Sequence, residues 1–380
     1  MVVMSACAAF QKGASTANEI VIGYTAIEND LGIDFAAQKK TVLDLTAEIN
    51  ENGGIGGAKI KLVYCPQKFT SGGAQCANEF LQDGAVAVVG YGLTNDGPMY
   101  PLLKSADVPL LGSGAMPATA AALTPDGNHF FTSAGALGMY LATGKYLIEN
   151  VKPKKVGVIV GSDASATQAA NNFVKVPLNK AGIDVQLAPI TESNPDFTSA
   201  LNTVKDADFL LSLTGCTQAA AVFKQADALG LDVKGMVNSC WGTRNIAAMG
   251  DGAIGKWGWS YNVPVDDPQY ANRPDVKEFL RLAVKYGWDH NDSLGTYGLY
   301  LATVDFIKKA GGPAAKPIDV QKAIASADGV PFPLGSDQGL NCVEPPSAAV
   351  PTACNASGML IEIQPDKSVR ALTATFLSPA

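Results

Sequence analysis

The sequence has little of what most enzymes need. Its 380 residues include only two histidines, His129 and His290, which lie far apart in the chain. The GxSxG and HExxH patterns are absent, no glycine-rich stretch completes GxGxxG, and none ends in the GK[ST] of a P-loop. With no catalytic constellation, no cofactor motif and no metal-ligand spacing, we expect a protein that is not an enzyme and holds no cofactor or metal.

Positive charge is also scarce. The chain has 28 Lys and Arg against 35 Asp and Glu, a net charge of −7. Nucleic acid requires a basic face, so nucleic-acid binding is not expected. After the N-terminus no run of about 18 apolar residues occurs, so no membrane span is predicted. With 47% hydrophobic and 17% charged residues, the composition predicts a soluble protein of about two domains.

Residues 1–18 are expected to be a signal remnant and tether. Met4-Ser5-Ala6-Cys7 is similar to a bacterial lipobox, in which a cysteine after small residues becomes lipid-modified. An intact signal peptide has a basic start and roughly 7–15 apolar residues. Only six residues, none charged, precede Cys7, so the true start lies upstream or the sequence is trimmed. We expect lipid attachment at Cys7; the alternative is an incidental cysteine in a disordered tail.

Short β-branched runs alternate with longer helical stretches along the chain. Strands are predicted over 19–23, 59–64, 85–90, 109–111, 130–132, 155–160, 184–189, 209–213 and 235–238. Helices are predicted over 32–50, 137–149, 166–181, 197–205, 218–229, 275–286 and 294–310, with a terminal hairpin over 359–363 and 369–376. This alternation predicts parallel sheets with helices on both faces, in two copies.

The most specific motif spans residues 46–64, TAEINENGGIGGAKIKLVY. A helix ends here in four glycines, which allow positive φ where the chain reverses, and a lysine-flanked strand follows. The motif resembles the opening of bacterial type I solute-binding proteins of ABC transporters, in the leucine/isoleucine/valine-binding branch. The resemblance extends over nearly the whole chain after Glu19, although only this opening is specific.

The resemblance implies an α/β fold of two similar lobes. Each lobe is a doubly wound, mostly parallel sheet with helices on both faces, and three strands form a hinge, as in the type I periplasmic binding protein fold. The crossings fall near Thr132, near Tyr261 and within 332–342. Residues 19–132 and 262–335 then form the N-terminal lobe, and residues 133–261 and 336–380 the C-terminal lobe.

The implied function is that of an extracytoplasmic receptor for a branched-chain amino-acid-type ABC importer. Such a receptor binds a small ligand between its lobes and delivers it to the permease subunits. We expect a monomer that touches the membrane only through a lipid anchor, at the cell surface or in the periplasm. The alternative is a ligand-sensing module of the same fold that is coupled to a signalling partner.

Six further cysteines suggest disulfides. An even count is typical of exported proteins, although six cysteines allow 15 connectivities. Pairing of sequence neighbours is economical, and it gives Cys65–Cys76, Cys216–Cys240 and Cys342–Cys354. The first pair lies near a disulfide that is common in the resembled family. The spacings do not fit a zinc site, and the alternative for each pair is two buried thiols.

In the first lobe, the resemblance places ligand contacts on loops that follow parallel strands. Leu93 and Thr94 fall where the family offers backbone amides and a hydroxyl to a ligand carboxylate. Gly114, Ala115 and Met116 fall on the next loop, where amino-acid binders have a threonine, and the loop 27–31 closes the rim. The alternatives are a helix cap for Thr94 and core packing for Met116.

In the second lobe, Ala166 and Gly215 (or Cys216) fall where the family has tyrosines, and Ser239 falls where it has a glutamate. Trp241 follows as a candidate stacking plane. Its alternative is a buried anchor beside a disulfide. Two further residues are not counted among the ligand contacts. Arg244 is a candidate cation, with an exposed surface residue as its alternative. Asp292 is expected to cap a helix, and its alternative is the carboxylate that meets a cationic ligand.

The differences from the family at these positions affect which ligand is expected. A desolvated α-ammonium needs a carboxylate or several carbonyl acceptors. The expected glutamate is Ser239 here, and the second hydroxyl is Met116. We interpret the amino-acid signature as eroded, so that a small carboxylate without an ammonium, aromatic or aliphatic, is at least as good a candidate as a branched-chain amino acid.

Overall fold

The computed structural model describes residues 19–30, 34–68, 70–93, 96–114, 124–162, 164–191, 196–231, 233–348 and 350–378. Of the residues singled out above, Cys7, Leu31, Thr94, Ala115 and Met116 lie outside these ranges. None of the helices in the described ranges is long and apolar enough to cross a membrane.

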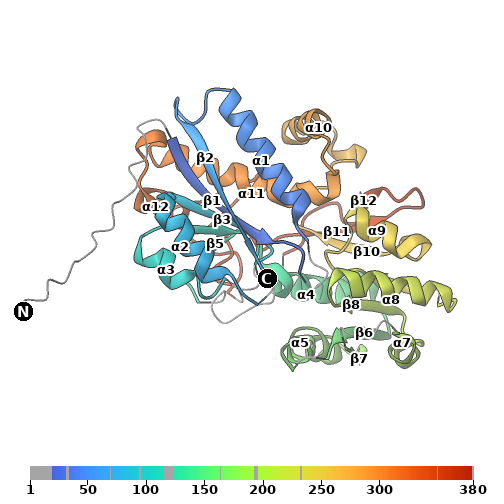
Figure 1. Cartoon of the computed structure of the whole chain (residues 1–380). Coiled ribbons are helices and arrows are strands. Elements are labelled where there is room, and N and C mark those ends of the chain that lie inside the picture. Colours follow the sequence, from blue (N-terminus) through green and yellow to red (C-terminus); the bar gives the residue numbers. More distant parts are fainter. Residues whose placement is uncertain are drawn as a thin grey trace, which may run out of the picture.

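Two sheets form the scaffold (Figure 1). The first is entirely parallel, in the order β2-β1-β3-β4-β5. Its strands are β1 (Glu19–Ile27), β2 (Lys59–Gln67), β3 (Ala87–Tyr91), β4 (Leu110–Gly112) and β5 (His129–Phe131). Parallel strands of this kind need crossover helices, which is why β-branched runs and helical stretches alternate in the sequence.

The second sheet has the order β12-β11-β10-β9-β8-β6-β7. Its strands are β6 (Lys155–Gly161), β7 (Asp184–Ile190), β8 (Phe209–Leu213), β9 (Lys234–Met236), β10 (Trp257–Ser260), β11 (Met359–Ile363) and β12 (Val369–Ala371). The strands from β7 to β10 are parallel, and the terminal hairpin β11–β12 adds two antiparallel strands at one edge. The mostly parallel, doubly wound fold class is therefore confirmed.

Helices cover both faces of the first sheet. They are α1 (Ala36–Glu51), α2 (Gly73–Asp83), α3 (Tyr100–Ser105), α10 (Pro274–Tyr286), α11 (His290–Lys309) and α12 (Pro317–Ala325). Side chains alternate along β1, so Ile20, Ile22 and Tyr24 pack in the cluster with α1 and α11, whereas Val21 packs in the cluster with α2 and α3. Both faces are thus apolar, as buried parallel strands require.

The second sheet is covered in the same way. Its helices are α4 (Gly135–Tyr146), α5 (Ala164–Ala170), α6 (Val176–Lys180), α7 (Thr198–Val204), α8 (Cys216–Ala228) and α9 (Thr243–Met249). Wider π-helical turns, Leu147–Val151 and Asn171–Lys175, extend α4 and join α5 to α6, and 3-10 turns lie at Gly250–Ala253, Pro268–Tyr270 and Gly312–Ala314. The helix predicted over 166–181 is therefore three short helical pieces in succession.

The glycine turn of the opening motif has a clear physical reason. Gly53, Gly54, Gly56 and Gly57 all have positive φ. At Gly54 a Cβ atom would lie only 1.9 Å from the carbonyl oxygen of Ala58, so a side chain is excluded there. The turn ends α1 and returns the chain into β2, far from the strand ends that face the second sheet.

Three chain segments connect the two sheets. The first leaves β5 for α4, the second leaves β10 at Tyr261, and the third runs from the end of α12 to β11. Their backbones are bonded to one another: Val263 donates to the carbonyl of Leu334 at 2.8 Å, and Cys354 donates to the carbonyl of Phe131 at 2.8 Å. These bonds make the segments one connected hinge region.

The structure forms all three expected disulfides. Their Cα–Cα distances are 5.5 Å for Cys65–Cys76, 5.0 Å for Cys216–Cys240 and 4.3 Å for Cys342–Cys354. The first joins β2 to α2. The prediction that neighbouring cysteines pair is confirmed.

Candidate functional site

The carboxyl ends of the parallel strands of both sheets converge where the hinge segments cross. Gly242 and Arg244 follow β9 of the second sheet, and they meet Asp34, which follows β1, and Asp292, in the first turn of α11. In open α/β sheets, ligands bind outside the carboxyl ends of the strands. The region between the two sheets at these strand ends, called the cleft from here on, is therefore the candidate site.

In the first sheet, the loops after β3, β4 and β5 are held together by two serines. Ser113 Oγ accepts a hydrogen bond from the backbone N–H of Gly92 at 3.0 Å, and Ser133 Oγ donates to the carbonyl of Ser113. Gly114 has a φ of +148°, and a Cβ atom there would lie 2.5 Å from Ser133 Oγ. A glycine is needed at this position because the two loops approach so closely.

Leu93 lies at the edge of this loop cluster, but its side chain is not free to contact a ligand. It is 1% exposed and packs against Gly90 and Leu110 in the core. A Cβ atom on Gly90 would lie only 2.3 Å from Leu93 Cδ1. Leu93 can therefore serve a ligand only through its backbone, which is the role the family gives to this position.

In the second sheet, the structure brings Gly215 and Ser239 together. The Cys216–Cys240 disulfide joins the residues that directly follow them, with a Cα–Cα distance of 5.0 Å. Gly215 and Ser239 are both exposed, and the Ser239 N–H is held by the side chain of Asn238 at 2.8 Å. The disulfide thus fixes the loops after β8 and β9 in one surface at the cleft.

The other second-lobe candidates differ in exposure. Ala166 is half-buried in α5. Trp241 is 6% exposed, and its indole N–H donates to the carbonyl of Trp259 at 2.8 Å, which fits the interpretation of a buried anchor beside the disulfide. Arg244 has a side chain that is 73% exposed, as expected for a surface arginine, and its guanidinium lies 3.9 Å from the Asp34 carboxylate across the cleft.

The expected role of Asp292 as a helix cap is wrong. Asp289 caps α11, because its Oδ1 accepts a hydrogen bond from the N–H of Asp292 at 3.1 Å. The Asp292 carboxyl instead packs against Gly242 of the second lobe, where a Cβ atom would lie 2.1 Å from Oδ1. Burial, followed by repulsion from Asp289, raises the pKa of Asp292 to about 6, although Arg244 opposes this rise.

Three tyrosines at the hinge were missed by the sequence reasoning. Tyr91 ends β3, Tyr140 lies on α4, and Tyr261 follows β10. Burial raises the pKa of Tyr91 and of Tyr140 to about 12, and it also raises the pKa of Tyr261, which both of the others raise further by repulsion. The Tyr261 hydroxyl itself donates to the carbonyl of Gly135 at the start of α4, at 2.6 Å. The sequence did offer a signal for two of them: Tyr91 stands at the end of a strand, and Tyr261 stands at a crossing between the lobes.

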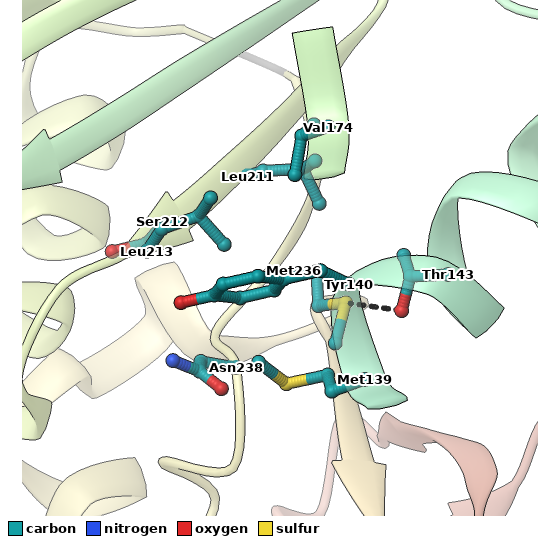
Figure 2. A pocket seen from close by; sticks show the side chains of 9 residues that line it. All are labelled: Met139, Tyr140, Thr143, Val174, Leu211, Ser212, Leu213, Met236 and Asn238. Carbon is teal, nitrogen blue, oxygen red and sulfur yellow. Dashed lines mark hydrogen bonds between the residues drawn. The ribbon is translucent and has the colours of Figure 1, made fainter. Parts of the chain in front are cut away.

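A small pocket opens beside Tyr140 (Figure 2). It lies between α4 and the carboxyl ends of β8 and β9, and its volume is about 10 Å³, roughly the space of one water molecule. Its walls are mostly apolar, and the polar residues among them are Tyr140, Thr143, Ser212 and Asn238. Within the described ranges, no group of three or more His, Cys, Asp or Glu side chains is placed to hold a metal ion.

Two mostly parallel α/β lobes with a shared hinge define the class of two-lobed solute receptors with the type I periplasmic binding protein fold. The chain belongs to the periplasmic binding protein family, whose model matches residues 30–340. A search of curated protein sequences finds no significant match.

Solved structures share the whole fold at low sequence identity. A leucine-binding protein from Thermotoga maritima is 15% identical with a TM-score of 0.74, over 95% of this chain and 99% of its own. A valine-bound branched-chain amino acid ABC transporter protein from Thermus thermophilus is 15% identical with a TM-score of 0.75, over 93% and 95%. A solute-binding protein from R. palustris in complex with 4-hydroxybenzoate is 19% identical with a TM-score of 0.74, over 95% and 97%.

Proposed function

We propose that this protein is the extracytoplasmic receptor of an ABC importer and that it binds a small solute between its two lobes. The lobes are residues 19–132 with 262–335 and residues 133–261 with 336–380. The observation that carries the proposal is the convergence of strand ends from both sheets on one cleft, where Gly242 of one lobe packs on Asp292 of the other. Such a cleft closes by hinge motion, and the ligand stabilises the closed form.

The fold neighbours bind different ligands: leucine and valine in two cases and an aromatic carboxylate in another. For this chain we infer a small carboxylate without an ammonium. Ser239 presents a hydroxyl, which is no strong partner for an ammonium, at the exposed end of β9. The acidic groups that face the cleft, Asp34 and Asp292, already have the protein's own cation Arg244 nearby. An ammonium would compete with that arginine.

The proposal also includes the location of the receptor, its membrane anchor and its partner. Three disulfides fit an oxidising compartment outside the cytoplasm. A lipid on Cys7 would tether the receptor to the membrane. The receptor would be a monomer, and the permease subunits would bind its closed form. No step in this function breaks a covalent bond.

A thermal-shift screen tests the proposal. Each branched-chain amino acid is compared with the acid of the same skeleton that lacks the ammonium, because a ligand that binds only the folded state raises the melting temperature. We expect the deaminated acids to raise it more. Stabilisation by leucine or valine alone would refute the ligand class, and no stabilisation by any small carboxylate or amino acid would refute the receptor proposal.

A further inference from the structure

The pocket beside Tyr140 is lined by α4, β8, β9 with the loop after it, and Val174 of the π-helical turn Asn171–Lys175 (Figure 2). Leu211 and Leu213 lie two residues apart on β8 and point to the same face of the sheet. Met236 and Asn238 have the same spacing along β9 and the loop after it. The α4 helix lies over this face, so the pocket runs from the carboxyl ends of the strands inward between helix and sheet.

The two ends of this pocket differ. Leu213, Asn238 and Tyr140 stand at the end that faces the cleft, because the strands β8 and β9 terminate there. Leu211, Met236 and Thr143 form the inner end, where Thr143 Oγ1 lies 3.6 Å from the sulfur of Met236. The mouth has two polar groups, and the interior is mostly apolar because the Thr143 hydroxyl is turned to the Met236 sulfur. This arrangement suits the tail of an amphiphilic ligand.

The ring of Tyr140 closes the pocket. It crosses the space between the two ends, with its hydroxyl directed away from Thr143 (Figure 2). The remaining volume of about 10 Å³ is too small for any part of a ligand beyond a single small group. The inner walls, however, include Met139 and Met236, whose unbranched side chains adapt readily to a new neighbour.

We propose that Tyr140 is a specificity-determining residue, and that its ring sets how long an apolar tail the ligand can place between α4 and the second sheet. The inference rests on the proposed function, in which the carboxylate head lies between the lobes. The ligand class is then a monocarboxylate with a short apolar tail that ends against the Tyr140 ring. Removal of the ring joins the inner space, lined by Met236 and Leu211, to the cleft.

Calorimetric titrations with straight-chain monocarboxylates, from propanoate to octanoate, test this assignment. Wild-type affinity should rise with chain length and then fall once the tail reaches Tyr140. In Tyr140→Ala the optimum should move to longer chains by about two methylene groups, each improving the dissociation constant about fourfold. Tyr140→Phe keeps the ring and should keep the wild-type optimum. Tyr146→Phe, on the same helix but packed against Trp257, is the matched control.

The outcomes separate the two claims. Binding with an unmoved length optimum in Tyr140→Ala, or an equal loss of affinity for all chain lengths, would overturn the role of Tyr140 and leave the receptor function standing. Failure of wild-type protein to bind any carboxylate in the series or any amino acid would overturn both. If Tyr140→Ala does not fold, Tyr140→Leu removes the ring with a smaller loss of volume and should shift the optimum in the same direction.

Discussion

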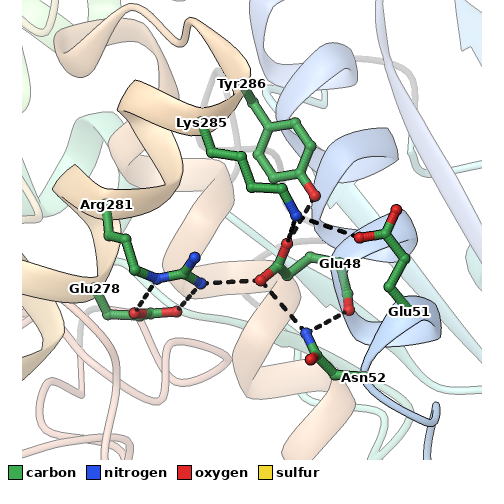
Figure 3. A network of polar contacts seen from close by, with 7 residues as sticks. All are labelled: Glu48, Glu51, Asn52, Glu278, Arg281, Lys285 and Tyr286. Atoms are coloured by element: carbon green, nitrogen blue, oxygen red, sulfur yellow. Dashed lines mark hydrogen bonds and ion pairs between the residues drawn. The ribbon is translucent and has the colours of Figure 1, made fainter.

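Glu48 joins the first helix of the chain to a helix more than two hundred residues later (Figure 3). Its side chain is 13% exposed, and it accepts from Lys285 at 2.5 Å, Tyr286 at 2.7 Å and Arg281 at 2.9 Å, all on α10. These three hydrogen bonds, that of Lys285 first, lower the pKa of Glu48 to about 2. The carboxylate therefore favours the folded state whenever it is ionised.

Glu48→Gln should lower the free energy of unfolding at pH 7 by about 1–2 kcal/mol, a value discounted because Arg281 and Lys285 are 50% and 42% exposed. The folded pKa lies below the usual 4.5, so the stabilisation is present above about pH 4.5 and is lost as the pH falls toward 2. Urea unfolding at several pH values measures this. Glu51→Gln, at a carboxylate that is 66% exposed, is the control and should change little.

Asp292 shows the opposite behaviour. Its folded pKa of about 6 lies above the usual 3.8, so the folded state loses stability as the pH rises from about 4 to 6. Asp292→Asn should therefore raise the free energy of unfolding at pH 7 by about 1–2 kcal/mol and have no such effect at pH 4. Asp305→Asn, an exposed site on the same helix, is the control. A variant that is less stable than wild type at pH 7 would contradict this reading of Asp292.

At the scale of elements, the segment between Cys342 and Cys354 reinforces the hinge. Thr352 and Cys354 form backbone bonds of 2.9 and 2.8 Å with Phe131, the last residue of β5, and Asn341 donates to the carbonyl of Cys354 at 2.7 Å. The disulfide closes this segment on itself. It thereby holds the third crossing against the first.

Replacement of Cys342 and Cys354 by serine should lower the free energy of unfolding by about 3 kcal/mol, because a loop of this length becomes free in the unfolded chain. The Cys65–Cys76 pair closes a loop of almost the same length, with a sequence separation of 11 against 12, and its replacement should cost as much. Only the hinge pair should also change ligand affinity. Equal affinity changes in both double variants, seen by calorimetry, would argue against a hinge role.

Most strands could be predicted because they are short, mostly apolar runs between turn residues: β8 matches its predicted range, and β6 and β7 each run one residue further. The strand β10 was missed because Trp-Gly-Trp-Ser has neither alternation nor a β-branched run, and it is held by pairing to β11. No range was predicted for the helices α2, α3, α9 and α12, which are all short and are stabilised mainly by tertiary packing.

The site was harder to predict than the fold. Gly215 and Ser239 follow strands, so their position at the cleft could be inferred from topology alone. The environment of Asp292 could not, because the contact with Gly242 depends on how two distant segments pack. The same holds for Tyr140, whose place on α4 gives no sign in the sequence that its ring crosses a pocket.

At the scale of the whole molecule, Gly242 and Asp292 bring the two lobes into direct contact. A Cβ atom at position 242 would lie 2.1 Å from Asp292 Oδ1, whereas the backbone angles of Gly242, φ −59° and ψ 152°, are open to any residue. Gly242→Ala should therefore leave the melting temperature of the free protein nearly unchanged and weaken ligand binding by about 1–3 kcal/mol.

The double variant Gly242→Ala with Asp292→Gly distinguishes this steric effect from a local one. Removal of the Asp292 side chain should restore much of the lost affinity, because the obstacle to closure is gone. Additive losses in the double variant, measured by the same titration, would show that the two residues do not act through their contact.

Small-angle X-ray scattering, with and without the strongest carboxylate from the melting screen, tests the central claim that a small solute is bound between two closing lobes. The account predicts that the radius of gyration falls when the ligand saturates the protein, and that Gly242→Ala reduces this fall. A ligand that binds tightly while the radius of gyration of the wild-type protein stays constant would contradict it.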